Sequence, residues 1–233
     1  MTATHSVIVP TLNCAPFIAE ALNSALAQLG PEDEVIVADN GSTDDTIAVV
    51  EAIAADRRVI VLREAKRGPA AARNTGMRAA RGRYISFLDG DDYWPEGRLD
   101  RMMQVLDAAP EADAVFGRVR VQFDSSLGDR LPAEQAVYGV LDGIHAPLIG
   151  LWNYVFKREI LERCGVQNEE MLAGEDVDYI LRLRAAGLNC AVYDGTAIVY
   201  RRHGANITRD PKTIERANMR IIASHVRRKR PQT

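Results

Sequence analysis

The densest group of chemically active side chains in this sequence is Asp89-Gly90-Asp91-Asp92, with three carboxylates in four residues. Like charges this close repel, so holding them at the end of a buried strand is costly unless a positive group binds there. Carboxylate oxygens suit Mg²⁺ or Mn²⁺ rather than zinc, and Mg²⁺ usually completes its shell with phosphate oxygens. The segment therefore predicts a site where a metal ion and a diphosphate meet.

The elements that must position this loop follow a strand–helix alternation in the first half of the chain. We expect strands at residues 6–10, 34–39, 59–62 and 84–88, and helices at residues 15–29 and from Pro69 onward. Such alternation implies an α/β, Rossmann-like fold with a mostly parallel central sheet flanked by helices. The carboxylate loop directly follows the fourth strand. That position favours a binding site over the alternative, an acidic turn that only caps a helix at residues 95–109.

Ligands of a parallel α/β sheet bind beyond the carboxyl ends of its strands. This rule places four polar loops along one edge of the sheet, at residues 10–13, 39–42, 66–68 and 89–92. Four polar loops on one edge predict a binding site without reference to any known protein.

The second half of the chain is less regular. We expect a strand at residues 113–123, a short aromatic strand from Trp152 to Phe156, a helix at residues 175–186 and a late strand from Thr196 to Arg201. These elements suit a smaller region appended to the first sheet, within the single domain that 233 residues can form.

The composition excludes several classes of protein. With 29 basic and 32 acidic residues the net charge is −3, which argues against a nucleic-acid binder. Cys14, Cys164 and Cys190 are far apart and form no C-x-x-C pair, which disfavours a cysteine zinc site and fits a reducing compartment. No signal-peptide pattern and no run approaching about 18 apolar residues is found. These features favour the cytoplasm.

The only strongly biased segment is the basic run Arg227-Arg228-Lys229-Arg230 near the C-terminus. One interpretation is a solvated tail. The other is a peripheral contact with an anionic membrane, at its inner face.

The order of these segments resembles the family 2 glycosyltransferases, which have a GT-A fold. The resemblance spans roughly residues 5 to 208 and rests on motifs that are modest singly but specific as an ordered set. The motifs are Val7-Ile8-Val9-Pro10-Thr11-Leu12-Asn13, Val37-Ala38-Asp39-Asn40-Gly41-Ser42-Thr43-Asp44, Gly68-Pro69-Ala70-Ala71-Ala72-Arg73-Asn74-Thr75-Gly76, Phe87-Leu88-Asp89-Gly90-Asp91-Asp92-Tyr93-Trp94-Pro95, Gly174-Glu175-Asp176 and Tyr200-Arg201-Arg202-His203.

The resemblance implies a nucleotide-sugar donor, with UDP as the default nucleotide. Asp39 would hydrogen-bond the base, and Asp89 would contact the ribose or the metal. Arg73 would lie near the nucleotide, on a helix whose N-terminus can face the diphosphate. Lys66 could help to neutralise phosphate, or could form a surface pair with Arg67. The complete set implied to bind the nucleotide is Pro10, Thr11, Asn13, Asp39, Lys66, Gly68, Arg73, Asp89 and Gly90.

The same resemblance implies the metal ligands and the catalytic base. Asp91 would be the chief ligand of Mn²⁺ or Mg²⁺, and His203 would approach the metal or the diphosphate. His203 could instead be a structural hydrogen-bonding residue at a strand end. Asp176 would be the general base. Asp176 could instead stabilise the start of its helix together with Glu175, because carboxylates interact favourably with the positive N-terminal end of a helix.

On the acceptor side, the resemblance implies that Trp152 and Glu175 line the acceptor site; core packing is the alternative for Trp152. Residues 1–110 would form the nucleotide-sugar-binding half, and residues 111–233 the acceptor-side half of the same domain. The pattern departs from the family at Asn40, where a second Asp is common. It also departs around residues 164–170, which leaves the acceptor class open.

General chemistry agrees with these implied roles. Breaking a sugar–diphosphate bond develops negative charge on the leaving oxygen, which a divalent ion stabilises. An acceptor hydroxyl is a poor nucleophile until a carboxylate takes its proton. A base on the face opposite the leaving diphosphate gives direct displacement with inversion, so one carboxylate cluster serves the metal and another the proton.

The implied function is therefore an inverting, metal-dependent transfer of a sugar from a nucleotide-diphosphate sugar to a glycan or lipid-linked acceptor, in the synthesis of a cell-surface polysaccharide, glycolipid or related glycan. A sugar-phosphate nucleotidyltransferase is an alternative, but Pro10-Thr11-Leu12-Asn13 stands where its Gly-rich phosphate loop would be. The second alternative function is that of a non-catalytic relative that binds a nucleotide sugar. It would hold the donor without releasing nucleoside diphosphate.

Overall fold

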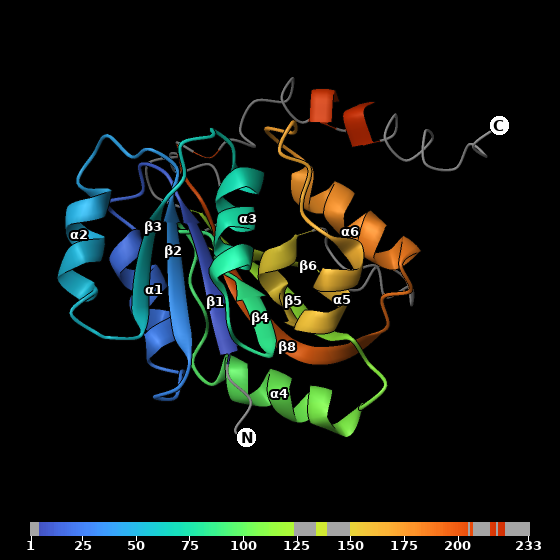
Figure 1. The fold of residues 1–233 in the computed structure, drawn as a ribbon. Helices are drawn as coiled ribbons and strands as arrows, with labels where there is room; N and C mark the ends of the chain where they lie inside the picture. The colour runs from blue at the N-terminus through green and yellow to red at the C-terminus, as the bar shows by residue number, and fades with distance from the viewer. Residues whose placement is uncertain are drawn as a thin grey trace.

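A twisted sheet of eight strands forms the centre of the molecule in this computed structural model (Figure 1). The structure describes residues 5–123, 134–138, 150–204, 206, 215–217 and 219–221. The basic run at 227–230 lies outside these residues. Within the described part of the chain, no helix is long and apolar enough to cross a membrane.

Four parallel strands build the first half of the sheet in the order β3-β2-β1-β4. Buried Val and Ile residues dominate these strands, as expected for a parallel sheet that is covered on both faces. The helices α1, α2 and α3 make the crossover connections. The bounds are β1 His5–Thr11, α1 Ile18–Leu26, β2 Glu34–Asp39, α2 Thr46–Ile53, β3 Val59–Arg63, α3 Pro69–Ala79 and β4 Tyr84–Phe87.

The second half continues the same sheet. β7 joins β4 and β5 with antiparallel pairing to both, β6 is antiparallel to β5, and the long β8 is parallel to β5. The predicted α/β fold with a mostly parallel sheet is confirmed. The bounds are α4 Arg98–Ala108, β5 Ala114–Phe123, β6 Glu134–Tyr138, the 3₁₀ turn η2 Leu151–Asn153, β7 Tyr154–Lys157, α5 Arg158–Cys164, α6 Glu175–Ala185 and β8 Cys190–Arg202.

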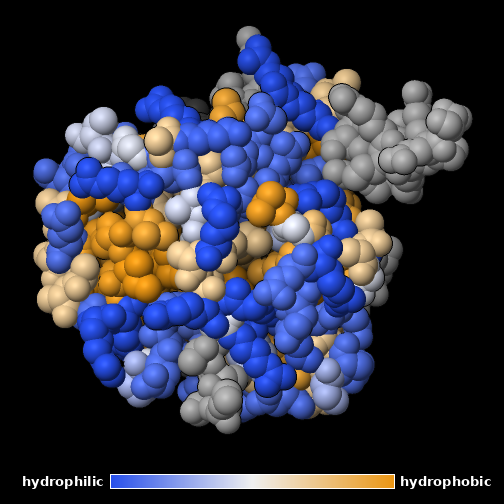
Figure 2. Space-filling model, in the orientation of Figure 1, coloured by the Kyte–Doolittle hydropathy of each residue, from blue (hydrophilic) through white to orange (hydrophobic). Residues whose placement is uncertain are grey.

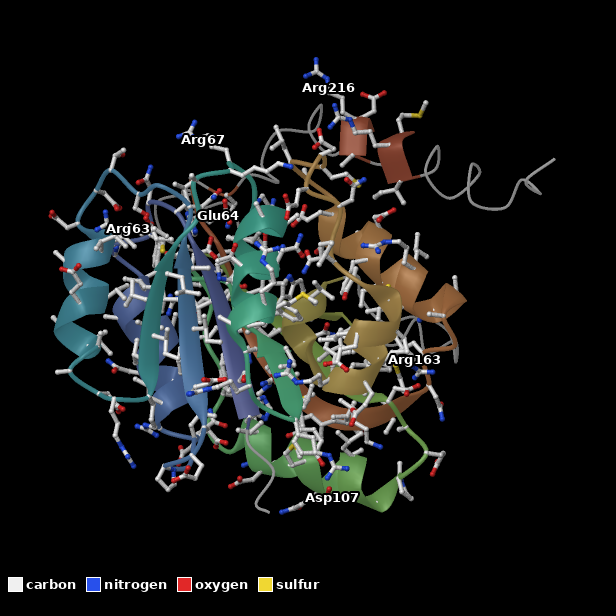
Figure 3. The ribbon with its side chains drawn as sticks, viewed as in Figure 1. Arg63, Glu64, Arg67, Asp107, Arg163 and Arg216 are labelled. Atoms are coloured by element: carbon white, nitrogen blue, oxygen red, sulfur yellow. The ribbon has the colours of Figure 1, made fainter. Side chains whose placement is uncertain are left out.

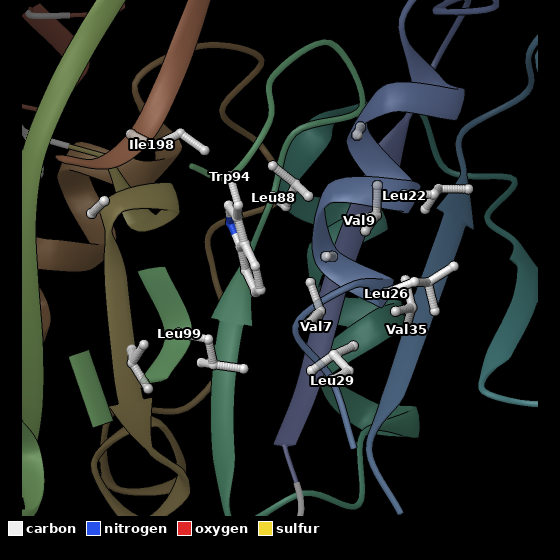
Figure 4. Packing of buried hydrophobic residues seen from close by; sticks show 14 of the residues in the cluster. Val7, Val9, Leu22, Leu26, Leu29, Val35, Leu88, Trp94, Leu99 and Ile198 are labelled. Carbon is white, nitrogen blue, oxygen red and sulfur yellow. The ribbon is translucent and has the colours of Figure 1, made fainter. Parts of the chain in front are cut away.

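Two apolar clusters hold the layers together, one on each face of the sheet. The first lies beneath α1 and α4, where Leu22 and Leu26 of α1 pack with Val7, Val35 and other strand residues (Figure 4). The second lies beneath α3, α5 and α6. Helix α3 sits mainly over β1 and β2. Figure 2 shows an apolar area beside it, over β2 and β3, where Ile60 and Leu62 are half-buried.

Four elements differ from the sequence-based prediction, one of which is β6, a strand where a long connection at residues 124–149 was expected. Trp152 begins no strand: it lies in the turn η2, and the strand starts only at Tyr154. β8 begins at Cys190, six residues before the expected start at Thr196, because it pairs along the whole of β5. α5 was not predicted, since its seven residues are too few to display a clear helical period.

Candidate active site

The carboxyl ends of β1 and β2 form one continuous surface of loops. Asp39, 4% exposed, ends β2 and accepts hydrogen bonds from the backbone N–H groups of Gly41 and Ser42. Asn13, with φ of 51°, accepts a hydrogen bond from the N–H of Thr43 through its Oδ1 (2.8 Å). These contacts fix the two loops against each other. They place Asp39 and Asn13 on the same side of the rim, which is the edge of the sheet formed by the loops at residues 10–13, 39–42, 66–68 and 89–92.

Asn40 connects this surface to the loop that precedes α3. Its Nδ2 donates to the carbonyls of Glu64 (3.2 Å) and Lys66 (2.7 Å), and its Oδ1 accepts from the N–H of Gly68 (2.7 Å). A carboxylate could accept from Gly68 but could not donate to the two carbonyls. Asn40 therefore holds the loop through both its amide donor and its amide acceptor.

Gly90 lies so close to the end of β1 that no side chain fits there. An added Cβ would lie 2.8 Å from Cys14 Sγ and 3.0 Å from Thr11 Oγ1. Its N–H donates to the carbonyl of Pro10 (3.3 Å), while Thr11 Oγ1 contacts Cys14 Sγ at 2.5 Å. Pro10, Thr11 and Gly90 thus form the floor of the rim, with the side chain of Thr11 buried.

The predicted metal ligands meet in space although 112 positions separate them. His203 Nε2 lies 3.0 Å from Asp91 Oδ2, and the Nδ2 of Asn206 donates to the same oxygen (3.3 Å). Phe17 stacks on the ring of His203 with centroids 4.5 Å apart, which fixes the ring orientation. The Asp91 carboxylate is 27% exposed and so can be reached from solvent.

This donor set fits a divalent ion. A carboxylate oxygen and an imidazole nitrogen are both ligands that Mn²⁺ accepts. Among the described residues no three His, Cys, Asp or Glu side chains are grouped to hold a metal ion. Asp91 and His203 would therefore supply two ligands, and phosphate oxygens and water would supply the rest.

Asp92 anchors the carboxylate loop. Its Oδ1 accepts from the backbone N–H of Arg201 (2.9 Å), and its Oδ2 is buried with no hydrogen-bond partner within the described structure. Burial, reinforced by the Asp91 charge, raises the pKa of Asp92 well above its usual value. Arg201 Nη1 donates to the Asp91 carbonyl (3.2 Å), so β8 holds the loop at two points.

Arg73 joins the carboxylate loop to the start of α6. It is 4% exposed, and it donates from Nη2 to Asp89 Oδ1 (2.7 Å) and from Nη1 to Glu175 Oε1 (2.6 Å). Glu175 is 5% exposed. Both terminal nitrogens of the guanidinium thus contact protein carboxylates, while Nε is buried without a hydrogen-bond partner among the described residues. Glu175 is therefore a partner of Arg73 in this structure.

Asp176 follows on the first turn of α6, partly buried beside this ion pair. Burial, together with the neighbouring Glu175 carboxylate, raises the pKa of Asp176 to about 7, while Arg73 opposes the increase. A carboxylate with a pKa near the working pH is suited to accept a proton. Burial likewise raises the pKa of Asp89, which is the first residue of the carboxylate loop and contacts the same arginine.

Lys66 and Gly68 lie on the loop before α3. Lys66 Nζ is 3.1 Å from Glu169 Oε2 and 3.2 Å from Glu170 Oε1, so the lysine links this loop to the segment before α6. Gly68, with φ of 128°, precedes α3, and Pro69 takes the first helical position as predicted. The N-terminus of α3 therefore opens toward the rim.

Trp152 lies apart from Glu175. It stacks on Tyr200 with ring centroids 5.8 Å apart and planes at 4°, and it packs against the cluster beneath α1 and α4. α6, which carries Glu175, packs in the cluster on the other face. The structure therefore does not bring the two predicted acceptor residues into one cluster, and their acceptor roles stay predictions.

Sequence comparison assigns the chain to a known family. The sequence model of Glycosyl transferase family 2 matches residues 6–205. The chain belongs to glycosyltransferase family 2.

Curated relatives and solved structures agree with this membership. The family 2 chain is 34% identical over 214 residues to the succinoglycan biosynthesis protein ExoO of Rhizobium meliloti, covering 87% of this chain and 62% of ExoO. It is 27% identical over 209 residues to the Escherichia coli glucosyltransferase WfaP, covering 87% of this chain and 79% of WfaP. The chain thus spans less than two thirds of the length of ExoO.

Two solved structures show the same fold. Staphylococcus aureus TarS 1–349, in complex with UDP-GlcNAc, superposes with a TM-score of 0.75 at 22% identity, covering 94% of this chain and 66% of TarS 1–349. The Pyrobaculum calidifontis mannosyltransferase PcManGT, in complex with GDP-Man and Mn²⁺, gives 0.71 at 24% identity, covering 96% and 64%. The expected GT-A fold of this family 2 chain is confirmed.

Sequence reasoning missed two contributors to the site of this family 2 chain. Asn206 contacts Asp91, and Phe17 stacks on His203. Neither residue belongs to a motif that would single it out: Asn206 lies in neither a helix nor a strand, and Phe17 precedes a helix.

Proposed function

We propose that this chain transfers a sugar from a nucleotide-diphosphate sugar to an acceptor hydroxyl, with inversion at the sugar carbon and Asp176 as the general base. The observation that carries the proposal is the Arg73 bridge. It holds Asp89 of the carboxylate loop and Glu175, next to Asp176, in one cluster. Donor chemistry and proton removal would thereby occur at adjacent positions.

The donor would occupy the rim formed by residues 10–13, 39–42, 66–68 and 89–90. Asp39 and Asn13 would contact the base, and the N-terminus of α3 would stabilise the negative diphosphate. Residues 1–110 would thus form the donor half, and residues 111–233, which carry α6, the acceptor half.

Asp91 and His203 would hold a divalent ion, which when bound would supply Lewis-acid stabilisation of the leaving diphosphate. In the transfer itself, Asp176 takes the proton of the acceptor hydroxyl. The hydroxyl oxygen forms a bond to the anomeric carbon of the sugar, and the bond from that carbon to the diphosphate oxygen breaks with its electron pair on the diphosphate. One displacement of this kind inverts the anomeric configuration.

Arg73 contributes by position and charge. Buried between Asp89 and Glu175, it fixes the first turn of α6 relative to the carboxylate loop. Its charge also opposes the increase in the pKa of Asp176, so that a useful fraction of the base is ionised near neutral pH.

The names of the relatives support this function and a role in polysaccharide synthesis. ExoO is a succinoglycan biosynthesis protein, and WfaP is named as a glucosyltransferase that uses UDP-Glc and a GlcNAc-diphosphoundecaprenol acceptor. The UDP-GlcNAc bound to TarS and the GDP-Man and Mn²⁺ bound to PcManGT support a nucleotide-sugar donor and a divalent metal for this chain. We adopt a UDP-sugar as the first donor to test.

The test is release of nucleoside diphosphate from a panel of UDP-, GDP- and dTDP-sugars, each with and without Mn²⁺ and in the presence of sugar acceptors that carry free hydroxyl groups. The proposal expects one donor to turn over only with the metal. Tight binding of a donor without any release of nucleoside diphosphate would identify a non-catalytic binding protein instead.

A further inference from the structure

The strand β3 forms one border of the sheet, and its outer edge pairs with no strand in the described part of the chain. The backbone of such an edge strand presents N–H and C=O groups that a further strand can bind. Soluble proteins commonly protect these edges with charges, a bulge or a covering element. β3 has little protection of this kind, because four of its five residues are apolar and its one charge, Arg63, lies at its end.

The pairing with β2 determines which backbone groups of β3 face outward. The N–H of Glu64 donates to the carbonyl of Asp39 (2.8 Å). Every second residue of a parallel strand bonds to the same neighbour, so Ile60 and Leu62 also bond to β2. Val61 lies between them and therefore directs both its N–H and its C=O away from the sheet.

The side chains of β3 alternate between the two faces of the sheet. Ile60 and Leu62 lie beneath α3 and are half-buried, and Figure 2 shows the apolar area at this position. Figure 3 shows that the alternation continues, with Arg63 on the side of α2 and Glu64 on the side of α3. Apolar side chains open to solvent beside unpaired backbone groups indicate a surface for strand pairing.

This edge is complementary to itself. A two-fold axis through Val61 sets two β3 strands antiparallel, with Ile60 of each copy opposite Leu62 of the other. Four apolar side chains then form one continuous area. The same register sets Glu64 opposite Arg58, which is a pair of opposite charges. Among the registers that bring outward-facing residues opposite each other, this one pairs the whole length of β3.

The helix α2 is suited to the same contact. It packs on β3 and lies at the same border of the molecule (Figure 1). Its exposed residues are Ala48, Glu51 and Ala52, and the two alanines are one helical turn apart. In a two-fold pairing of β3 strands, both α2 helices lie on one face of the joined sheet. Small side chains let two helices approach closely, so α2 presents little steric obstacle to this pairing.

We propose that the chain forms a two-fold dimer through β3 and α2, with one sheet continuous across both copies. Outward backbone groups of β3 supply hydrogen bonds, Ile60 and Leu62 supply apolar area, and α2 packs on its counterpart. Because the two β3 strands run antiparallel, the loops that follow them lie at opposite ends of the dimer. Each copy keeps its own donor rim accessible, so the dimer goes beyond the proposed function and does not depend on it.

Sedimentation equilibrium of the full chain at about 1 to 100 μM measures the association. We expect a dimer that Val61→Pro weakens by about tenfold or more, because proline removes an outward N–H that the ladder to β2 does not use. Ala52→Arg should weaken it similarly, since a long charged side chain then stands between the two α2 helices. Ala185→Arg is the matched control, an exposed alanine at the end of α6.

A cysteine on the two-fold axis gives a second measurement. Residues that face each other in a hydrogen-bonded antiparallel pair have Cα atoms about 5.5 Å apart, which a disulfide can span. Val61→Cys should therefore cross-link to its counterpart when oxidised glutathione is added. The wild type, with Cys14, Cys164 and Cys190, and the Ala185→Cys variant should stay uncross-linked.

Three results would overturn the proposal. The first is a wild-type chain that stays monomeric at about 100 μM. The second is a dimer with the wild-type dissociation constant in Ala52→Arg or in a folded Val61→Pro variant. The third is a dimeric Val61→Cys variant that does not cross-link, which would place the interface elsewhere. Far-UV circular dichroism shows whether Val61→Pro folds, and if it does not, Ala52→Arg and the cross-link decide.

Discussion

Nη1 of Arg73 lies 2.6 Å from Oε1 of Glu175, and both side chains are almost completely buried. The other edge of the same guanidinium contacts Asp89 at 2.7 Å. This arrangement connects α3, the carboxylate loop and α6 through one residue. Because Glu175 lies 102 positions from Arg73, this pairing of charges exists only in the folded chain.

Removal of the Arg73 charge should strongly destabilise the protein. Arg73→Met would leave Asp89 and Glu175 buried without their cation, and losing one partner of a buried pair costs about 3–5 kcal/mol. Urea denaturation measures the free energy of unfolding. Arg78→Met on the same helix is the control, because its side chain is 55% exposed and its contacts should contribute less than about 1 kcal/mol. Equal losses in the two variants would contradict the bridging role.

The transfer rate should depend on pH through Asp176. Its pKa is raised to about 7, so the base is protonated and inactive at lower pH and becomes ionised above it. The transfer rate with saturating donor should therefore rise between about pH 6 and pH 8 and then level off. UDP affinity, measured over the same range, controls for titration of the donor site. A rate that falls over this interval would contradict the assignment of Asp176 as a base.

Asp91 and His203 should act together in metal-dependent binding. Asp91→Ala and His203→Ala should each weaken UDP binding by about 10- to 100-fold in Mn²⁺. In EDTA, wild type and variants should bind with similar affinity. Calorimetric titration measures both conditions, and Asp44→Ala, on the adjacent loop, serves as a carboxylate control. Wild-type affinity of the Asp91 variant in Mn²⁺ would refute the ligand role.

Asn40→Asp should disturb the loop before α3, although the change is nearly isosteric. The variant loses both hydrogen bonds to the Glu64 and Lys66 carbonyls and sets a negative charge against them, at a cost of about 1–3 kcal/mol. Thermal denaturation should show the loss, whereas Asn168→Asp keeps its acceptor contact and should be neutral. A fully stable Asn40→Asp variant would show that the amide donors are dispensable.

The sequence predicted those parts of the fold and site that depend on short, local sequence patterns. The β-branched runs predicted β1 to β4, and the rule for parallel sheets placed Asn13, Asp39 and Asp91 on one rim. The 3₁₀ turn at Trp152 and the partners of Arg73 could not be predicted. A turn of three residues has no period, and the Arg73–Glu175 contact joins residues 102 positions apart, which leaves no trace in local spacing.

The most direct test of the account compares Asp176→Asn with the wild type for both nucleotide binding and sugar transfer, using the donor that turns over in the panel. The side chains are nearly equal in size, so only the proton acceptor is lost. We predict a UDP affinity within about threefold of wild type and a transfer rate lower by about 10²- to 10⁴-fold. Transfer at the wild-type rate, with the affinity unchanged, would contradict the assignment of Asp176 as the base and with it the proposed mechanism.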